Sequence, residues 1–458
     1  MAKYKAYPEY KDSGVEWLGN VPAEWLITEL KRYSWVKGGY AFPSDSFISF
    51  GEPVIRIGDI SQDGSINLEN CKYVSHTLAK QSRSYTVRNG ELLMAMTGAT
   101  IGKAGFYECE FPALINQRVG LFKVLDKLMH YRFLWYTLKS YGYQEYIKLT
   151  AFGGAQPNIS DVGMVGYRTT VPSLQEQSRI ASFLDHETAK IDNLIEKHQQ
   201  LIELLKEKRQ AVISHAVTKG LNHEVPMKDS GVEWLGDIPS HWLCTKIKHI
   251  ALLTPKKSSV NFKNNDECTF IPMEKLKRNS LVTDESKLIR DVISGYTYFE
   301  DNDLLMAKVT PCFENKNIAV ARGLVNSIGF GSTEIYVLRP TDKIRVNYLL
   351  YRLQEDNFIR AATAAMTGAG GLRRVPSDFL LNYPIAIPPK AEMDAIVAYL
   401  NAQEIHYDLM EKNATQAVQL LQERRTALIS AAVIGKIDVR DWAAPDTQDI
   451  EESQEAIA

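Results

Sequence analysis

The residues that could carry chemistry lie in short segments that match known catalytic motifs only in part. Gly98 to Lys103 has the sequence GATIGK, which is close to a phosphate-binding loop. Its glycines are separated by three residues instead of four, and Ala104 stands where such a loop requires Ser or Thr. Glu314-Asn-Lys316 has the spacing of half a nuclease metal site, but a single Glu-x-Lys occurs often by chance.

Other signatures of catalysis are incomplete as well. Asn382-Tyr-Pro384 resembles the Asn-Pro-Pro-aromatic motif of amino-methyltransferases only superficially, because its second proline is misplaced. No H-E-x-x-H or G-x-S-x-G segment occurs. No C-x-x-C pair occurs among the five scattered cysteines, which argues against a thiolate zinc site or a disulfide framework. We therefore predict a chain with no catalytic site and no metal of its own.

Composition fits a globular protein of several domains that can approach nucleic acid. The chain has 458 residues, and it contains no apolar run of about 18 residues and no signal-like N-terminus. We therefore expect a cytoplasmic protein with reduced thiols and no membrane contact. Residues 441–458 carry six acidic and no basic side chains, so without them the net charge of −2 becomes +4. A mildly basic body permits DNA binding without demonstrating it.

An internal repeat is the strongest signal in the sequence. Lys11 to Trp25 (KDSGVEWLGNVPAEW) and Lys228 to Trp242 (KDSGVEWLGDIPSHW) agree at eleven of fifteen positions, with an offset of 217. Two further blocks recur with an offset of 216: Pro172, Glu176, Ile180 and Leu184 match Pro388, Glu392, Ile396 and Leu400, and Glu207, Arg209, Ala211, Ile213 and Ser214 match Glu423, Arg425, Ala427, Ile429 and Ser430. The chain therefore consists of one unit written twice, with divergent residues between the matched blocks.

The sequence pattern of each repeat predicts a globular domain with both strands and helices, followed by a long helix. Short β-rich runs, such as Glu91–Met96 and Asp303–Ala307, precede aromatic-rich helical stretches at about 129–146 and 346–364. About 44 residues without Gly or Pro follow at Leu174–Val217 and at Lys390–Ile434. The fold class is α/β (α+β) with two globular copies, two long helices and an internal pseudo-twofold repeat. The predicted boundaries are 1–172 and 221–388 for the globular domains, 173–220 and 389–437 for the helices, and 438–458 for an acidic, disordered tail.

The long helices carry a heptad-like apolar pattern that predicts an antiparallel coiled coil. Two polar positions repeat within it: Glu187 and Gln403 near the helix starts, and Lys208 and Arg424 near the ends. Parallel pairing would place Lys208 against Arg424, a like-charge contact that costs energy. Antiparallel pairing would instead place Glu187 near Arg424 and Gln403 near Lys208. The alternative is that each helix packs only on its own domain. The predicted contact positions are Ile180, Leu184, Ile191, Leu194, Leu201, Leu205, Ile396, Leu400, Tyr407, Met410, Leu421 and Leu428.

The duplicated boxes, the two divergent domains and the two long helices together resemble a specificity subunit of type I restriction–modification systems. The phrases VEWLGxxPxxW, the Pro-x-x-x-Glu helix openings and LLMAKVTPCFENKNIAV at 304–320 fit the resemblance, which covers the chain except the acidic tail. It implies two target-recognition domains, each binding one half of a split double-stranded DNA site, with the helices setting the distance between them.

The resemblance also implies the partners. Two methyltransferase subunits would dock on the helices, and restriction/translocase subunits would join through them. S-adenosylmethionine, ATP and Mg are expected on those partner subunits and not on this chain. A self-sufficient methyltransferase or nuclease, and a scaffold that binds only proteins, are the rival classes; DNA methylation or cleavage by the isolated chain would favour the first, and absence of any sequence preference the second.

Residues that contact DNA are expected in loops on this frame, because recognition usually varies there. Lys and Arg suit phosphates, and Arg, Lys, Asn and Gln suit base edges. The candidates are Thr97, Thr100, Lys103, Gln156 and Asn158 in the first domain, and Lys308, Thr310, Lys316, Arg373 and Arg374 in the second. The repeated boxes at 11–25 and 228–242 either pack internally or bind two copies of one partner.

Overall fold

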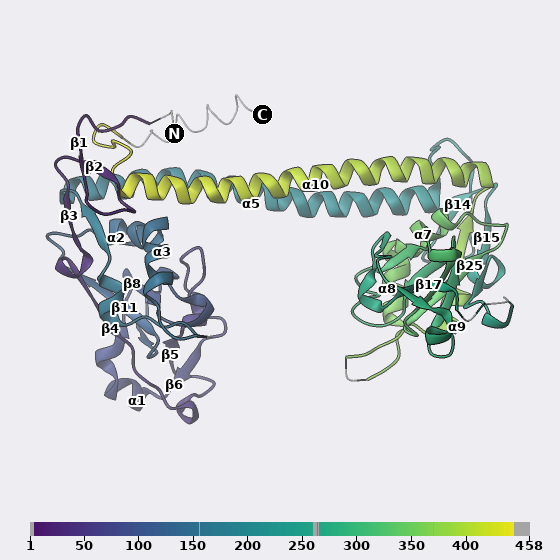
Figure 1. Ribbon diagram of the computed structural model, residues 1–458, viewed down its shortest axis with the longest axis horizontal. Coiled ribbons are helices and arrows are strands. Elements are labelled where there is room, and N and C mark those ends of the chain that lie inside the picture. Colours follow the sequence, from purple (N-terminus) through teal and green to yellow (C-terminus); the bar gives the residue numbers. More distant parts are fainter. Residues whose placement is uncertain (1–3, 155, 260–262, 264, 370, 444–458) are drawn as a thin grey trace. The chain divides into compact units, whose positions relative to one another are not determined.

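The computed structural model describes residues 4–154, 156–259, 263, 265–369 and 371–443, which form two compact units. Unit 1 comprises residues of 1–199 and 416–458, and unit 2 comprises residues of 200–415. Two long helices, α5 (Leu174–Lys219) and α10 (Lys390–Val433), contribute to both units (Figure 1). Unit 1 holds the first part of α5 and the last part of α10, and unit 2 holds the remainder of each.

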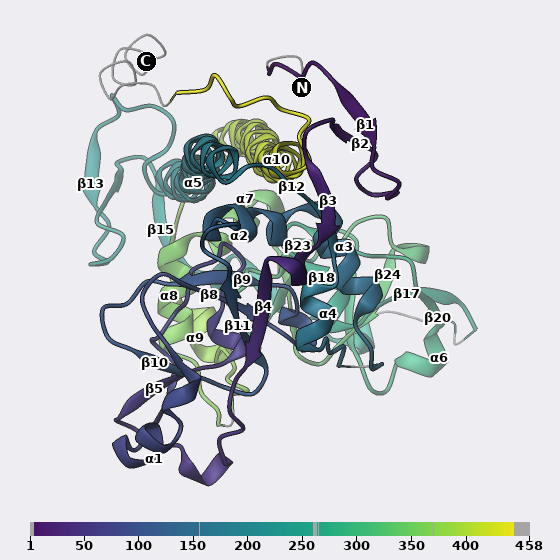
Figure 2. The ribbon, with the colours of Figure 1, turned by 90° about the vertical axis from the view of Figure 1, so that its left-hand side faces the viewer.

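Unit 1 is built on two four-stranded sheets that lie below α2 in Figure 2. The strand order β4-β11-β8-β9 is antiparallel throughout, whereas in β6-β5-β10-β7 the central pair β5 and β10 is parallel. Two small antiparallel pairs, β1-β2 and β12-β3, complete the unit. The bounds are β1 Tyr10–Asp12, β2 Asn20–Pro22, β3 Leu26–Glu29, β4 Ser34–Gly38, β5 Glu52–Ile55, β6 Lys72–Val74, β7 Thr86–Val87, β8 Glu91–Ala95, β9 Ala104–Tyr107, β10 Ala113–Ile115, β11 Val119–Val124 and β12 Arg168–Val171.

Strand β8 is buried on both faces, and its side chains alternate between two cores. Leu92 and Met94 pack with the aromatic core under the helices, while Leu93 and Ala95 pack between the two sheets. Successive side chains of a strand point to opposite faces, so a continuous apolar run is what a strand between two layers requires.

The predicted helical stretch at 129–146 is two helices. Helix α2 (Tyr131–Lys139) ends at Ser140, whose extended backbone interrupts the helix and whose side-chain oxygen accepts a hydrogen bond from the Tyr143 amide at the start of α3 (Tyr141–Thr150). A serine in this role is a favoured N-cap. The other helices of unit 1 are α1 His76–Gln81 and α4 Asp161–Val165.

Unit 2 has the same strand order as unit 1. The sheet β16-β25-β22-β23 is antiparallel, and in β20-β17-β24-β21 the central pair β17 and β24 is parallel. Leu304 and Met306 of β22 face the helix-covered core, and Leu305 and Ala307 face the second sheet, as in β8. The bounds are β13 Met227–Asp229, β14 Asp237–Pro239, β15 Leu243–Lys246, β16 Ala251–Leu253, β17 Glu267–Ile271, β18 Leu276–Lys277, β19 Ser280–Leu281, β20 Ser286–Leu288, β21 Thr297–Glu300, β22 Leu304–Ala307, β23 Ile318–Val320, β24 Ile328–Gly331, β25 Ile335–Pro340, β26 Pro384–Ile387, α6 Ile289–Val292, α7 Val346–Gln354, α8 Asp356–Ala364 and α9 Ser377–Asn382.

The repeated boxes pack internally in both units. Trp25 and Trp242 are buried, and the indole of Trp17 stacks on Tyr167 while that of Trp234 stacks on Tyr383. The Trp17 Nε1 also donates a hydrogen bond to the Arg168 carbonyl oxygen (3.1 Å). Internal packing therefore accounts for these four repeated tryptophans.

Burial along α5 follows the predicted heptad frame in one half of the heptad and departs from it in the other. Leu184, Ile191 and Leu205 are buried as expected, but Leu194 and Leu201 are 46% and 38% exposed. The positions that turn inward follow one residue later, at Ile195 and Ile202, with Thr188 and Arg209 in the same series. The remaining predicted positions, Ile180, Ile396, Leu400, Tyr407, Met410, Leu421 and Leu428, are buried or half-buried.

Within each unit the two helices run in opposite directions. In unit 1, Thr170 just before α5 bonds to Val433 at the end of α10, and Asp192 pairs with Arg425. In unit 2, Arg209 pairs with Glu404, whereas the later residue Gly220 lies beside the earlier residue Glu392. The predicted neighbours Glu187 and Arg424 both act on the Tyr4 phenol in unit 1, where burial and the Glu187 carboxylate raise the pKa of Tyr4 to about 12.

The first residues of the segment predicted as a tail, 438–442, pack against the rest of unit 1. Val439 is buried, and Trp442 packs edge-on against Phe183. The Asp438 amide donates to the Lys5 carbonyl oxygen (2.8 Å), so this segment is held against the N-terminal residues. Apolar side chains at 439 and 442 explain the packing, and the acidic residues 444–458 lie outside the described residues.

We predict that Ile195→Ala destabilises the chain and that the neighbouring Leu194→Ala does not. Ile195 packs against the core of unit 1, so its truncation should lower the free energy of unfolding by about 2 kcal/mol. Exposed Leu194 should change it by less than about 0.5 kcal/mol. Urea unfolding of the two full-length variants measures both values. If Leu194→Ala lowered the free energy of unfolding more than Ile195→Ala, the heptad frame predicted from the sequence would be the correct one.

Candidate nucleic-acid interface

The five DNA-contact candidates of unit 1 lie on two adjacent segments, residues 97–103 and 156–158, which we call loop pair 1. The Thr97 hydroxyl and the Gly98 amide both donate to the Pro157 carbonyl oxygen, at 3.0 and 2.8 Å. Gly98 adopts a positive φ of 68° there, a backbone conformation that is unfavourable for residues with a Cβ atom. The Thr100 hydroxyl donates to the Thr97 carbonyl oxygen (3.2 Å), and the Lys103 amide to that of Thr100 (3.0 Å).

Four of the five candidates of unit 2 come together in the same way, on residues 308–310 and 373–374, which we call loop pair 2. The Thr310 amide donates to the Arg373 carbonyl oxygen (3.0 Å), and the Thr310 hydroxyl accepts from the Arg373 amide (3.1 Å). The Lys308 ammonium lies over the Tyr336 ring, 5.3 Å from its centroid. Arg373 and Arg374 pair with Glu314 and Glu334.

Asn158 and Arg374 occupy the same position in their loop pairs. Asn158 forms bridges with Thr97 and Phe152, and Arg374 forms bridges with Val309 and Thr367. The two loop pairs therefore share a backbone arrangement and present different side chains.

A second matched position was missed from the sequence. The Met96 amide donates to the Arg118 carbonyl oxygen (2.9 Å), and the Lys308 amide donates to that of Glu334 (3.0 Å). Arg118 directly precedes β11, and Glu334 directly precedes β25. Strand β11 pairs with β8, and β25 pairs with β22. The residue just before β11 or β25 could therefore have been predicted to lie beside the loop that follows β8 or β22.

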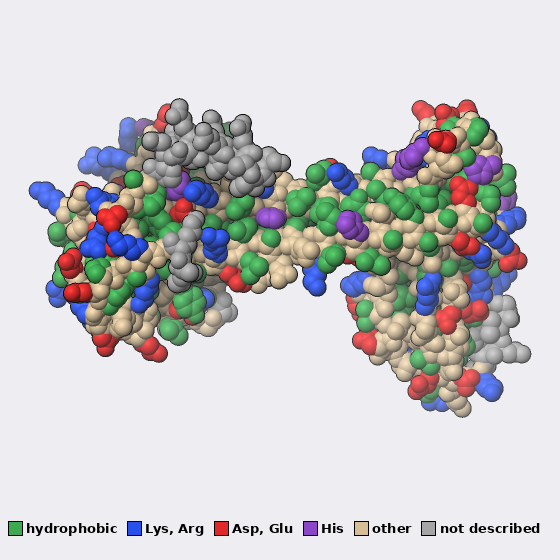
Figure 3. Space-filling view, turned by 90° about the horizontal axis from the view of Figure 1, so that it is seen from above, with side chains coloured by type: hydrophobic (Ala, Val, Ile, Leu, Met, Phe, Trp, Pro, Cys, Tyr) green, Lys and Arg blue, Asp and Glu red, His purple; other side chains and the backbone are tan. Residues whose placement is uncertain are grey.

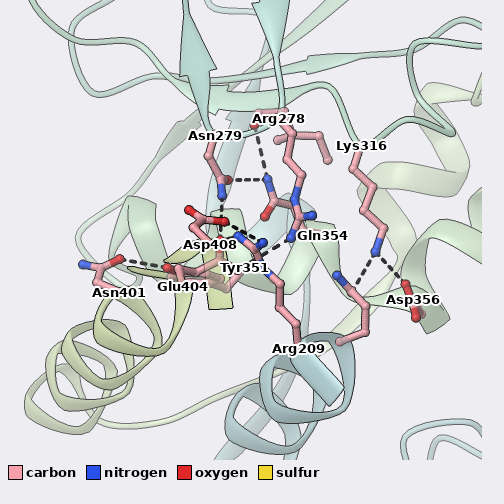
Figure 4. A network of polar contacts seen from close by, with 12 residues as sticks. Arg209, Arg278, Asn279, Lys316, Tyr351, Gln354, Asp356, Asn401, Glu404 and Asp408 are labelled. Atoms are coloured by element: carbon pink, nitrogen blue, oxygen red, sulfur yellow. Dashed lines mark hydrogen bonds and ion pairs between the residues drawn. The ribbon is translucent and has the colours of Figure 1, made fainter. Parts of the chain in front are cut away.

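Lys316 lies away from loop pair 2 and contacts the helices instead. Its ammonium bonds to the Asp356 carboxylate (2.6 Å), as Figure 4 shows, and also to the Gln210 side-chain oxygen of α5 (2.7 Å). The side chain is only 15% exposed, and burial lowers the pKa of Lys316. A lysine held in this way is poorly placed for a phosphate.

Lys316 belongs to a polar network that joins the globular part of unit 2 to both helices (Figure 4). At its centre the Arg209 guanidinium of α5 contacts the Glu404 carboxylate of α10 through Nε (2.9 Å) and Nη2, and Asp408 through Nη1 (2.7 Å). The Glu404 carboxylate raises the pKa of Arg209, which stays charged.

The hairpin β18–β19 reaches this network through its turn. Arg278 lies 3.6 Å from Glu404, and the Asn279 side-chain oxygen accepts from the Gln354 amide nitrogen of α7 (2.6 Å). Asn279 has a φ of 58°, a conformation that asparagine tolerates better than most residues. Charged groups at such depth are held by pairing.

Among the described residues, no three His, Cys, Asp or Glu side chains gather closely enough to hold a metal ion. In the same part of the chain, no helix combines the length and the apolarity needed to cross a lipid bilayer.

Comparison with known proteins gives a consistent result. Residues 22–206 match the family model described as type I restriction modification DNA specificity domain. The EcoAI specificity subunit of Escherichia coli is 35% identical over 41% of this chain and 32% of its own length, so the match spans about a third of that relative. The EcoKI specificity subunit of E. coli K12 is 21% identical over 96% of this chain and 95% of its own length.

Two solved structures share the fold. The HsdS subunit from Thermoanaerobacter tengcongensis matches with a TM-score of 0.52 and 15% identity, covering 91% of this chain and 98% of its own. A chain from a structure that concerns complex assembly and conformational transition of the type I R-M system matches with a TM-score of 0.68 and 15% identity, covering 91% of this chain and 99% of its own.

We predict that Glu404→Gln destabilises unit 2 much more than Asp408→Asn does. Glu404 is 11% exposed and its loss of charge leaves the buried Arg209 guanidinium undercompensated, which should cost about 3 kcal/mol. Asp408 is 63% exposed, so its pair with the same arginine should contribute less than about 1 kcal/mol. Chemical denaturation of the full-length variants compares the two, and equal losses would show that Arg209 is not effectively buried.

Proposed function

We propose that this chain, which is similar to type I restriction–modification specificity subunits, recognises DNA within such a complex and performs no catalysis itself. Loop pair 1 and loop pair 2 each contact one half of a split DNA site. The observation that carries this proposal is that the same backbone position presents Asn158 in unit 1 and Arg374 in unit 2. A shared frame with different polar side chains is what recognition of two different half-sites requires.

The recognised site is bipartite and asymmetric. Arginine pairs best with guanine, and loop pair 1 has no arginine at the position of Arg374, so the two loop pairs do not favour the same half-site. Residues 1–172 and 221–388 act as the target-recognition domains, and residues 173–220 and 389–437 act as helical spacers.

The spacers form one antiparallel coiled coil with a pseudo-twofold axis. Support comes from two ion pairs that the sequence offset of 216 relates: Asp192 with Arg425 in unit 1, and Asp408 with Arg209 in unit 2. A continuous helix of 46 residues is about 69 Å long at 1.5 Å per residue, so it can hold two DNA-contacting domains at a fixed distance.

Two copies of a methyltransferase subunit dock beside the helices. In unit 1 a groove beside Tyr141 is lined by Glu423, Ala427 and Ser430 of α10, and in unit 2 a groove beside Asp356 is lined by Glu207, Ala211 and Ser214 of α5. These α5 and α10 residues are identical in the two repeats.

Internal contacts account for part of that identity. The Ser430 hydroxyl caps the Tyr141 amide (2.9 Å), and the Ser214 hydroxyl donates to Glu355 (3.0 Å). Glu207 and Glu423 are exposed on both grooves, and two equivalent sites suit two copies of one partner. Hydrophobic side chains are also exposed along α5 and α10 (Figure 3), among them Leu204, Ile405 and Leu420. S-adenosylmethionine, ATP and Mg bind to the partners, and restriction/translocase subunits join through the methyltransferases.

We predict that one added heptad in each helix lengthens the gap between the two half-sites and leaves both half-sites unchanged. Seven residues inserted within Leu194–Leu205 and seven within Met410–Leu421 preserve the heptad and add about 10 Å, or about three base pairs. Mapping methylated adenines in DNA modified by the assembled complex measures the gap. An unchanged gap with normal methylation would refute the role of the helices as a spacer. If the complex of the unmodified chain methylated DNA without any sequence preference, the proposed function would be refuted.

A further inference from the structure

Arg374 has a side chain whose orientation is fixed by a carboxylate. Its Nε donates to Glu334 Oε2 (2.8 Å) and its Nη2 donates to Glu334 Oε1 (3.0 Å), so one edge of the guanidinium is fully engaged. Hydrogen bonding from Arg374 lowers the pKa of Glu334, so the carboxylate stays ionised and the pair persists at neutral pH. Bidentate pairing of this kind fixes the guanidinium plane as well as its position.

The backbone of Arg374 is fixed too. Its amide donates to the Thr367 carbonyl oxygen (2.8 Å), and the Thr367 amide donates back to the Arg374 carbonyl oxygen (3.0 Å). The partner Glu334 is held by its own amide, which donates to the Ser332 hydroxyl (3.2 Å), and by its carbonyl oxygen, which accepts from the Lys308 amide (3.0 Å). Both ends of the pair are therefore anchored to the sheet framework.

The outer edge of the same guanidinium remains available. Glu334 occupies Nε and one N–H of Nη2, which leaves the N–H groups of Nη1 and the second N–H of Nη2 on the outer edge. The Arg374 side chain is 46% exposed, so this edge can reach a ligand. Two parallel donors on one arginine edge match the O6 and N7 acceptors of guanine in the major groove.

We propose that Arg374 recognises a guanine in the half-site bound by unit 2, with Glu334 as the residue that positions it. The inference rests on the proposed function and adds the base that this side chain selects. A phosphate is the weaker candidate, because the Glu334 carboxylate beside the guanidinium repels an oxyanion, whereas the neutral acceptors of a base edge meet no such repulsion. Fixing the side chain before binding also reduces the conformational entropy lost when the base is bound.

The neighbouring residue and the first unit offer contrasts. Arg373 makes a single contact of 3.3 Å to Glu314, so its guanidinium plane is less constrained and suits a phosphate. In unit 1 the equivalent of Arg374 is Asn158, and the equivalent of Glu334 is Arg118. At these matched positions the arginine held by a carboxylate occurs in unit 2, so sensitivity to loss of a guanine through this contact is expected in the half-site bound by unit 2.

The test uses the complex assembled with its methyltransferase partner and DNA in which single guanines are replaced by 7-deazaguanine. This base lacks the N7 acceptor and keeps normal pairing. For the unmodified chain, one replacement in one half-site should weaken binding several-fold, because it removes the N7 acceptor and keeps O6. Arg374→Gln removes both donors, so it should bind the natural site more weakly by roughly 5- to 150-fold, the range for one bidentate base contact, and should lose the sensitivity to that replacement.

Two further variants separate the roles of the residues. Glu334→Gln should remain sensitive at the same guanine with several-fold lower discrimination, because the arginine stays but its orientation is less fixed. Arg373→Gln should weaken binding to all sequences equally and reduce the slope of log affinity against log salt by about one, as loss of a phosphate contact does.

Several results would overturn the inference. The first is that the half-site bound by unit 2 contains no guanine. The second is that Arg374→Gln weakens binding equally on all DNA sequences and reduces the slope of log affinity against log salt. The third is that Glu334→Gln leaves the discrimination at the guanine unchanged. Because Arg374 and Glu334 are partly exposed, thermal unfolding should show that these variants remain folded. Failure of the proposed function looks different, since the unmodified chain's complex would then show no sequence preference at all.

Discussion

The structure depends on cores that neither half of the chain can complete alone. In unit 1, Phe133 and Tyr136 of α2 share a core with Leu428 and Ile429 of α10. In unit 2, Tyr348 and Leu349 share theirs with Ile213 near the end of α5. Each long helix therefore contributes one end to each core, and residues at these contacts are constrained by packing density. The two units differ in their loops, where loop pair 1 and loop pair 2 present different side chains on the same backbone arrangement.

Much of the fold could be predicted from the sequence because it follows from local patterns. The apolar runs at Leu92–Ala95 and Leu304–Ala307 are strands buried on both faces, and Pro172 and Pro388 mark the starts of the two long helices. The heptad frame of α5 could not be assigned correctly, because Leu194-Ile195 and Leu201-Ile202 are adjacent apolar pairs that fit either of two frames. Polar residues such as Thr188 and Arg209 at the buried positions further obscured the correct one.

The candidate interface was predictable in outline only. The segments after β8 and β22 were chosen from the sequence, and nine of the ten candidates lie in the two loop pairs that contain these segments. The role of Lys316 could not be inferred, because its partner Asp356 is 40 residues away in the sequence. The same limit hides the pair of Arg374 with Glu334, and that of Arg209 with Glu404 at a separation of 195 residues. Pairings at such distances depend on tertiary structure and leave no local pattern.

We propose that two different surfaces on one repeated frame recognise two different stretches of DNA at a fixed separation. Selection from a random double-stranded DNA library by the assembled complex, followed by sequencing of the bound molecules, tests this claim most directly. The bound molecules should share two short conserved sequences that differ from each other and are separated by a constant number of unconserved base pairs. A palindrome, one uninterrupted sequence, or a separation that varies among the selected molecules would contradict it.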